Sequence, residues 1–272
     1  MKKIGITLSI LTVLLYACKD EDVITQNDLA STQATQVHLF AEKIFDNIGK
    51  TVEEGFTDNG QNKSCPSYSI INADTSDVDT LIINFGNGDP SCLNYEILRS
   101  GKIVITYTGG YRDSLSVITT TFDNYYINYN LVQGERIVTN QGRNNSGNMW
   151  FTIDVNNASI NTNNNGTIDW ESSRVREWVS GQETYFDISD DRYKITGSAS
   201  GNAANGNAFA VEITESLDVD LGCLFSCVIK SGKTKISPNG YPDRIINYGD
   251  SICDCNVDVI INGTTYPIVI GN

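Results

Sequence analysis

The N-terminal segment constrains this chain most, because it has the layout of a secretory signal. Lys2 and Lys3 give a positive start, an apolar run extends from Ile4 to Ala17, and Cys18 follows directly. The run is shorter than the ~20 apolar residues that a membrane-spanning helix needs. The segment therefore predicts export, which places the rest of the chain where disulfides form.

The tetrad Leu15-Tyr16-Ala17-Cys18 resembles the lipobox of bacterial lipoproteins. In that family the cysteine thiol is acylated, for instance with palmitate, and the segment before it is removed. The resemblance implies a signal peptide at residues 1–17 and makes Cys18 the lipidated first residue of the mature chain. An ordinary signal peptide and a short transmembrane helix are the alternatives.

The residues after Cys18 bear on where the chain is held. Lys19-Asp20-Glu21-Asp22 resembles the export tag that sends Bacteroidota lipoproteins to the outer face of the outer membrane. A solvated acidic linker is the alternative. Residues 18–35 are polar, which predicts a flexible tether. We therefore expect a lipid anchor in the cell outer membrane, with the chain facing outward.

Composition argues against nucleic acid as a partner. Removing residues 1–17 takes away two lysines and no acid, so the formal charge changes from −14 to −16, with 17 basic residues against 33 acidic ones. An acidic surface repels phosphate backbones, whereas a nucleic-acid-binding domain shows clustered Lys and Arg. We expect a single domain over residues 36–272.

Seven cysteines are present, and assigning Cys18 to the lipid leaves an even number, which is typical of a disulfide framework. The other six are Cys65, Cys92, Cys223, Cys227, Cys253 and Cys255. We expect Cys65–Cys92 to join the first strands to the next hairpin. Cys227–Cys253 would hold two C-terminal strands together, which leaves Cys223–Cys255. Because Cys253 and Cys255 would point to the same face of a strand, the exchange of their partners stays open.

One short amphipathic helix is predicted at the N-terminal edge of the domain. Between Gln36 and Glu54, apolar residues recur at helical spacing. His38, the only histidine, falls on or beside this helix, and a single histidine there is expected to be structural or solvated.

After Gly55 the apolar pattern changes to period two, which predicts strands. Turn signals such as Asn205-Gly206 and Asn262-Gly263 separate them and fit two-residue hairpins. We expect an all-β domain, an antiparallel meander that forms two packed or strongly curved sheets. The predicted strands are Tyr68–Ala73, Thr80–Phe85, Lys102–Thr108, Ser114–Phe122, Tyr125–Tyr129, Glu135–Asn140, Met149–Val155, Thr167–Trp178, Tyr193–Gly197, Ala208–Thr214, Cys227–Ile236, Arg244–Tyr248, Val257–Ile261 and Thr265–Ile270.

An arginine–tryptophan stripe is the best candidate for ligand binding. Trp170, Arg174, Arg176 and Trp178 alternate along a predicted strand and share one face. Indole rings could stack on a sugar while guanidinium groups hold its hydroxyls. The alternative is a structural ladder in which each Arg lies over a Trp. Tyr125, Tyr126 and Tyr129 form a second aromatic group.

Two patterns of oxygen-bearing side chains have ordinary alternatives. Asn161-x-Asn163-x-Asn165-Gly166-Thr167-x-Asp169 matches the front of an EF-hand-like calcium loop, but three of its four side chains are neutral amides and Ser172 replaces the final Glu, which favours an Asn-rich hairpin turn. Asp190 and Asp191, or Asp113 beside Arg112, offer carboxylates for the acid/base pair of a glycoside hydrolase. Turn and strand-end acids are the alternative. The sequence has no Ser–His–Asp set and no GxSxG elbow, so no catalytic residue, metal or cofactor is expected.

The order of several short motifs from about residue 65 onward resembles a group of Bacteroidota lipoproteins without an assigned activity. Cys223 and Cys255 look like additions to its pattern, and no catalytic residue follows from the resemblance. The resembling stretches are Phe85-Gly86, Arg99-Ser100-Gly101-Lys102-Ile103, Tyr107-Thr108-Gly109, Thr121-Phe122-Asp123-Asn124-Tyr125, Val138-Thr139-Asn140, Asp190-Asp191, Thr196-Gly197-Ser198 and Tyr248-Gly249-Asp250, with Cys92 and Cys253-Asp254 after the first and last.

Two functions from different classes follow. The first is a non-catalytic surface lipoprotein, held to the membrane by its lipid, that binds a glycan or protein or serves as a structural element. The alternative is an extracellular polysaccharide hydrolase that uses paired carboxylates. The absence of a catalytic histidine from the β region and the Asn/Gly-turned scaffold favour the first.

Overall fold

The computed structural model of the chain describes residues 26–58, 65–71, 78–88, 97–163, 166–184, 187–223 and 227–269. The signal segment with Cys18, and Cys92, lie outside the described residues. Cys65 is itself disulfide-bonded. Within the described ranges, no helix is long and apolar enough to cross a membrane.

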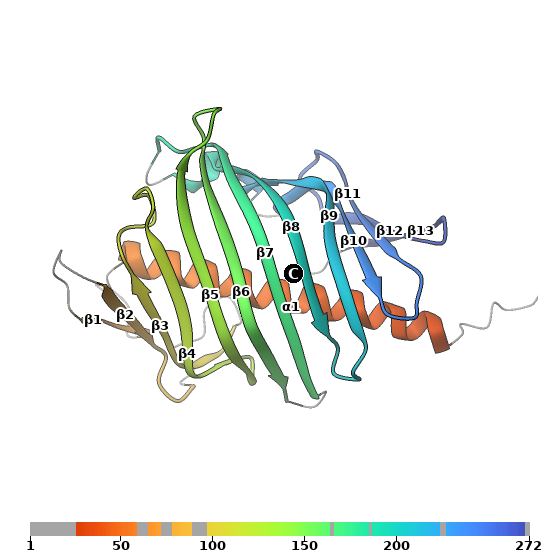
Figure 1. Cartoon of the computed structure of the whole chain (residues 1–272), viewed down its shortest axis with the longest axis horizontal. Coiled ribbons are helices and arrows are strands. Elements are labelled where there is room, and N and C mark those ends of the chain that lie inside the picture. Colours follow the sequence, from red (N-terminus) through yellow and green to blue (C-terminus); the bar gives the residue numbers. More distant parts are fainter. Residues whose placement is uncertain are drawn as a thin grey trace, which may run out of the picture.

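The described chain forms one long helix followed by thirteen strands and two short 3-10 helices (Figure 1). The bounds are α1 (Gln26–Asp58), β1 (Ser67–Ile71), β2 (Asp79–Asn84), β3 (Arg99–Tyr107), β4 (Val117–Ile127), β5 (Asn130–Arg143), β6 (Met149–Thr162), β7 (Gly166–Ser180), η2 (Ile188–Asp190), β8 (Arg192–Asn202), β9 (Ala208–Asp220), η3 (Leu221–Cys223), β10 (Ile229–Pro238), β11 (Arg244–Asp250), β12 (Asn256–Ile261) and β13 (Thr264–Val269).

All strands belong to a single antiparallel sheet in which each strand pairs with the next along the chain. The predicted meander is therefore confirmed, but the prediction of two packed sheets is wrong. The reason is that α1, and not a second sheet, covers the apolar face: Figure 1 shows the helix running across the strands on one side of the sheet. One covered face is enough for an alternating strand pattern.

Helix α1 crosses most of the width of the sheet. Its 33 residues give a length of about 50 Å, and neighbouring strands lie ~4.8 Å apart, so the helix spans roughly ten strands. Near its start, Gln33 accepts a hydrogen bond from Asn205 in the β8–β9 turn at 2.8 Å. Near its end, Gly55 lies against Leu81 and Ile83 of β2.

The helix is longer than predicted and begins inside the segment assigned to the tether. It starts at Gln26 and ends at Asp58, whereas the apolar spacing indicated only Gln36–Glu54. Ala34 and Thr35 are buried. Contact with the sheet therefore starts at least three residues before the apolar pattern, and tertiary packing stabilises helix where sequence periodicity is weak.

Local sequence explains most of the strands and one of the predicted turns. The Asn262-Gly263 turn is confirmed: both residues have positive φ, 50° and 79°, as a two-residue type I′ hairpin requires. The Asn205-Gly206 turn is wider, since β8 ends at Asn202 and β9 starts at Ala208.

Two predicted strands, Ser114–Phe122 and Tyr125–Tyr129, form the single strand β4. An irregularity between Thr121 and Tyr126 divides it, and Asn124 has a φ of 48°. Opposite it, Gly101 has a φ of 78°, and an added Cβ would lie 1.9 Å from the Asn124 carbonyl oxygen. The bulge therefore needs a glycine at this position.

Two disulfides join the β9–β10 connection to the β11–β12 connection. Cys223 pairs with Cys253 and Cys227 with Cys255, at Cα–Cα distances of 5.5 and 5.0 Å. The expected Cys227–Cys253 and Cys223–Cys255 pairs are therefore wrong, and the exchanged pairing holds. Cys253 and Cys255 lie in the connection 251–255, not in a strand, so the cross-strand pairing expected for them does not apply.

The pairing predicts a specific peptide map under non-reducing conditions. Cleavage before Asp254 and after Phe225 separates all four cysteines, and mass spectrometry should then find Cys223 linked to Cys253 and Cys227 linked to Cys255. The same digest after reduction is the control and should release four separate peptides. A Cys227–Cys253 peptide in the unreduced sample would show that the pairing is different.

Candidate functional site

The predicted arginine–tryptophan stripe lies on the inner face of the sheet, beneath α1. Trp170, Arg174, Arg176 and Trp178 share one face of β7, as expected. Both tryptophans are buried, at 2% and 3% exposure. The Arg174 and Arg176 side chains are 8% and 16% exposed. The four side chains therefore form part of the packing between helix and sheet and not an open surface patch.

Trp170 contacts the only histidine of the chain. Its ring stacks on Phe45 of α1 with centroids 5.4 Å apart, and its Nε1 donates to His38 Nδ1 at 3.4 Å. An indole N–H can only donate, so His38 Nδ1 is the acceptor in this contact. Nε2 lies 3.0 Å from a Glu42 oxygen. His38 is fully buried and links α1 to β7.

The two arginines of β7 bind carboxylates of α1. Arg174 Nε donates to Glu42 Oε1 at 3.2 Å, and a second nitrogen of the same guanidinium also bonds that oxygen. Arg176 Nη2 donates to Glu53 Oε1 at 3.1 Å. A guanidinium fork suits a carboxylate, and here it attaches the helix to the sheet.

Aromatic rings surround Arg176, and an arginine covers Trp178, though not in the pattern expected for a ladder. The Arg176 guanidinium lies over Tyr193 at 5.0 Å and over Tyr111 and Phe151 at 5.5 Å. Trp178 is covered by Arg112 from the β3–β4 loop, at 4.6 Å. The cation–π partners therefore come from neighbouring strands and loops, which strand spacing alone cannot show.

A third arginine, the buried Arg136 of β5, completes a cluster of charged side chains with α1. Its side chain lies against Gly49, where an added Cβ would be 2.9 Å from Nη2. Gly49 makes room for the Arg136 guanidinium, whose charge interacts with Asp46 and Glu53 of the helix. We call Glu42, Asp46, Glu53, Arg136, Arg174 and Arg176 the acid–arginine cluster.

Glu42 and Asp46, which lie one helical turn apart in this cluster, have pKa values that shift in opposite directions. Burial alone would raise the pKa of Glu42, but His38 and Arg174 hold it well below its usual range. The pKa of Asp46 is raised from 3.8 to about 6 by burial and by the Glu42 carboxylate, against the pull of Arg136, Arg176 and Arg174. Solvent still reaches the Asp46 side chain and moderates these effects.

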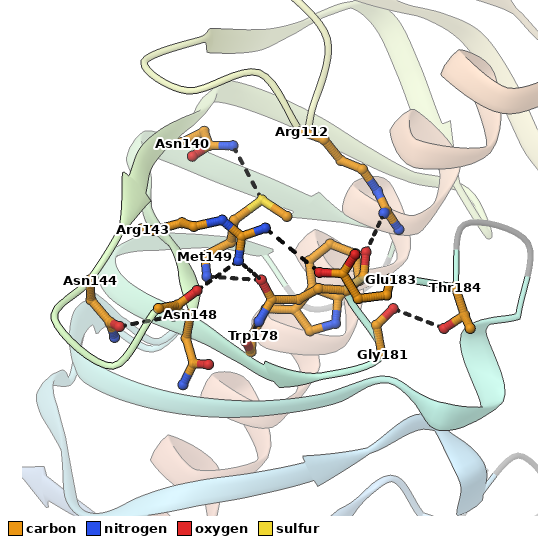
Figure 2. Close-up of polar contacts among 12 residues, drawn as sticks. Arg112, Asn140, Arg143, Asn144, Asn148, Met149, Trp178, Gly181, Glu183 and Thr184 are labelled. Atoms are coloured by element: carbon orange, nitrogen blue, oxygen red, sulfur yellow. Dashed lines mark hydrogen bonds and ion pairs between the residues drawn. The ribbon is translucent and has the colours of Figure 1, made fainter.

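The second group of polar contacts lies where long loops close one end of the sheet (Figure 2). Arg112 Nη1 donates to the Gln182 carbonyl at 2.7 Å, which ties the β3–β4 loop to the β7–β8 loop. Arg143 Nη1 donates to the Gln182 side chain at 2.9 Å. Asn144 and Asn148 both donate to a Glu177 carboxylate oxygen. We call this end, with the connections 108–116, 144–148, 181–184, 187–191 and 251–255, the loop rim.

Asp113, Asp190 and Asp191, the carboxylates considered for hydrolysis, each accept hydrogen bonds from different partners. Asp191 is buried, and Trp178 Nε1 and Tyr193 Oη donate to it at 3.1 Å each. Burial raises its pKa, and these two hydrogen bonds oppose the rise. Asp190 is exposed and accepts from Thr184 at 2.7 Å, and Asp113 accepts from the Gly110 amide at 2.7 Å. All three therefore bond loops or the ends of strands.

The remaining candidates are only partly placed. In the Asn161–Asp169 turn, residues 164–165 lie outside the described residues, so the choice between a hairpin turn and a calcium loop is not tested there. Among the residues that are described, no group of three or more His, Cys, Asp or Glu side chains could hold a metal ion. Tyr125 is buried, whereas Tyr126 and Tyr129 are 36% and 68% exposed, so the second aromatic group points in two directions.

Comparisons with protein-family models, with curated proteins and with solved structures found no match. The site is therefore interpreted from its own geometry. Sequence reasoning missed Glu42, Asp46 and Glu53, although they lie on one flank of the predicted helix. Acids repeated beside an apolar stripe were the available signal.

Replacing Glu42 by Gln removes the counter-charge of Arg174 while nearly keeping its shape. Breaking a fully buried pair costs roughly 3–5 kcal/mol. Because 27% of the Glu42 side chain is exposed, we expect the free energy of unfolding to fall by about 2 kcal/mol. Urea denaturation measures this change. Lys43→Gln, at an exposed position on the same helix, is the control and should change it by less than ~0.5 kcal/mol. An equal loss in both variants would contradict the pairing.

Asp46→Asn should stabilise the protein above about pH 6 and not at pH 4. An acid with a raised pKa favours the folded state while protonated, and this contribution is lost as the pH rises through about 6. The amide mimics the protonated acid. After allowance for screening we expect a melting temperature about 2 °C higher at pH 7.5. Asp243→Asn, on the exposed β10–β11 turn, is the matched control. A stabilisation that is the same at both pH values would refute the titration of Asp46.

Proposed function

We propose that this chain is a lipid-anchored lipoprotein of the cell outer membrane, whose β domain faces outward in a non-catalytic binding or structural role. The observation that carries the proposal is the position of α1. The helix begins only eight residues after Cys18, and it is the element around which the sheet is packed. A lipid on Cys18 would thus be joined to the core of the fold and not to a loose end.

The short spacing limits how far the domain can stand from a bilayer. Eight residues reach at most about 29 Å when fully extended. The several acyl chains typical of lipoproteins would hold such a domain firmly, whereas a single chain is marginal. The acidic sequence after Cys18 favours the outer surface, in line with its resemblance to the export tag.

The two ends of the sheet differ in a way that supports an outward-facing binding role. Successive connections of a meander alternate between the two ends of its strands. The β8–β9 turn, which contacts the start of α1 through Gln33, lies at the end opposite to the loop rim. The rim would therefore face away from the membrane. Long loops on a rigid sheet are where partners usually bind.

The anchor is tested by replacing Cys18 with Ala in the organism that makes the protein. We expect the variant to lose incorporation of a palmitate analogue, and to accumulate as precursor or leave the membrane fraction. Tyr16→Phe, which keeps the cysteine, is the control and should behave like the natural chain. Normal labelling and membrane retention after Cys18→Ala would refute the anchor.

Orientation is tested separately by replacing Lys19–Asp22 with four alanines. The lipid should still be attached, so the protein should stay in the membrane fraction. When protease is added to whole cells, digestion of the alanine variant should be much weaker than digestion of the natural protein if the acidic tetrad directs surface export. Equal digestion of both proteins would show that the tetrad is only a linker.

A further inference from the structure

A pocket of about 330 Å³ lies at the loop rim, at the C-terminal corner of the sheet. It sits where β11 and β13 end, where β12 begins, and where the connection 251–255 passes between them. Its volume is in the range of sites that hold a small ligand or a large side chain. It shares no residue with the acid–arginine cluster.

The walls of this corner pocket combine apolar and acidic side chains. Ile252 and Val269 are 61% and 70% exposed, and Ile268 is 40% exposed. Clustered exposed apolar groups at a pocket are typical of interaction sites. They would cover the aliphatic or aromatic parts of a ligand.

The acidic side chains of the pocket are Asp250, Asp254 and Asp258. Asp254 accepts hydrogen bonds from the amide and side chain of Asn256. Asp250 and Asp258 have no hydrogen bond or ion pair of their side chains with the described part of the chain. A pair of unneutralised carboxylates in a partly enclosed site attracts positive charge.

The lysines of β10, the strand beside β11, already pair with acids of β9. Lys230 pairs with Asp220 at 2.9 Å, and Lys233 pairs with Glu215 at 2.6 Å. These ion pairs connect β10 to β9, on the side away from the pocket. A cation for the pocket would therefore come from another molecule.

Disulfides hold one wall of the pocket in place. Cys253 and Cys255 flank Asp254 and bind Cys223 and Cys227. The connection that carries Ile252 and Asp254 is thus fixed at two points. A fixed wall lowers the entropy cost of binding, which favours a preformed site.

The free edge of β13 does not favour the addition of another strand. In the two-residue hairpin, Ile261 and Thr264 form a hydrogen-bonded pair, and such pairs alternate along the strands. Pro267 opposite Asp258 is then at a position whose backbone faces away from β12. It has no N–H to offer at the open edge. Recognition at this corner is therefore expected through side chains in the pocket.

We infer that the corner pocket docks a protein segment that presents a basic side chain between apolar ones. The ammonium or guanidinium group would meet Asp250 and Asp258, and the apolar neighbours would pack on Ile252 and Val269. Anionic lipid and nucleic acid are disfavoured by the same carboxylates. The inference gives a partner chemistry to the binding role of the proposed function, and it relies on the lipid anchor only for presentation outside the cell.

The test uses the mature chain in detergent micelles and three fluorescent peptides. One carries Leu-Lys-Leu at its centre, and the matched peptides carry Leu-Gln-Leu and Ser-Lys-Ser in its place. Fluorescence anisotropy, corrected for empty micelles, should show the first peptide binding about tenfold more tightly than either of the others. Equal binding of all three peptides, or no binding, would overturn the inference.

Variants locate the site and separate it from general acidity. The double change Asp250→Asn and Asp258→Asn, and Ile252→Ser alone, should each weaken the Leu-Lys-Leu peptide about tenfold. Asp243→Asn and Tyr129→Ser, exposed positions at the other end of the sheet, are the matched controls and should have no effect. An equal loss in the controls would indicate non-specific attraction and overturn the inference.

A folding check and a lipid-binding check show which part of the inference a negative result concerns. Unchanged melting temperatures and disulfide maps confirm that the variants fold, and a variant that fails this check is replaced by Ile252→Thr. Binding of phosphatidylglycerol vesicles in place of the peptide would identify a lipid surface as the partner and refute the inference. Loss of peptide binding with normal acylation of Cys18 refutes only the pocket, whereas normal peptide binding without acylation refutes only the anchor.

Discussion

The burial of α1 against the inner face of the sheet is the contact on which the rest of this structure depends. A thirteen-stranded sheet exposes a large apolar face unless another layer covers it, and here one helix provides that layer. Ile44, Phe45, Ile48 and Val52 of the helix are buried. Each buried side chain of this kind contributes roughly 1.5–3 kcal/mol.

Charged groups make this apolar contact specific. An apolar helix alone could slide or rotate over a smooth apolar surface, since dispersion contacts have little direction. The pairs Glu42–Arg174 and Glu53–Arg176, and the hydrogen bond from Arg99 to Asn47, fix the helix to β7 and β3. Buried ion pairs add little net stability but favour one arrangement over others.

The same layout separates the two ends of the molecule. One end includes the two-residue Asn262-Gly263 turn and lies beside the start of α1, while at the other end hydrogen bonds and two disulfides join the loops. The disulfides and hydrogen bonds give the loop rim a fixed shape. A domain anchored through α1 would present that rim, with its corner pocket, to its surroundings.

The sequence by itself determined the local features of this protein: most of the strands, the Asn262-Gly263 turn and the meander order follow from period-two alternation and from turn residues. Only the tertiary structure decided that there is one sheet, that α1 covers the Trp170–Trp178 stripe, and which cysteines pair. These outcomes depend on contacts between distant positions, such as Trp170 with His38, 132 residues apart. Strand spacing shows that side chains share a face, but not what covers it, because burial is set by the element that packs there.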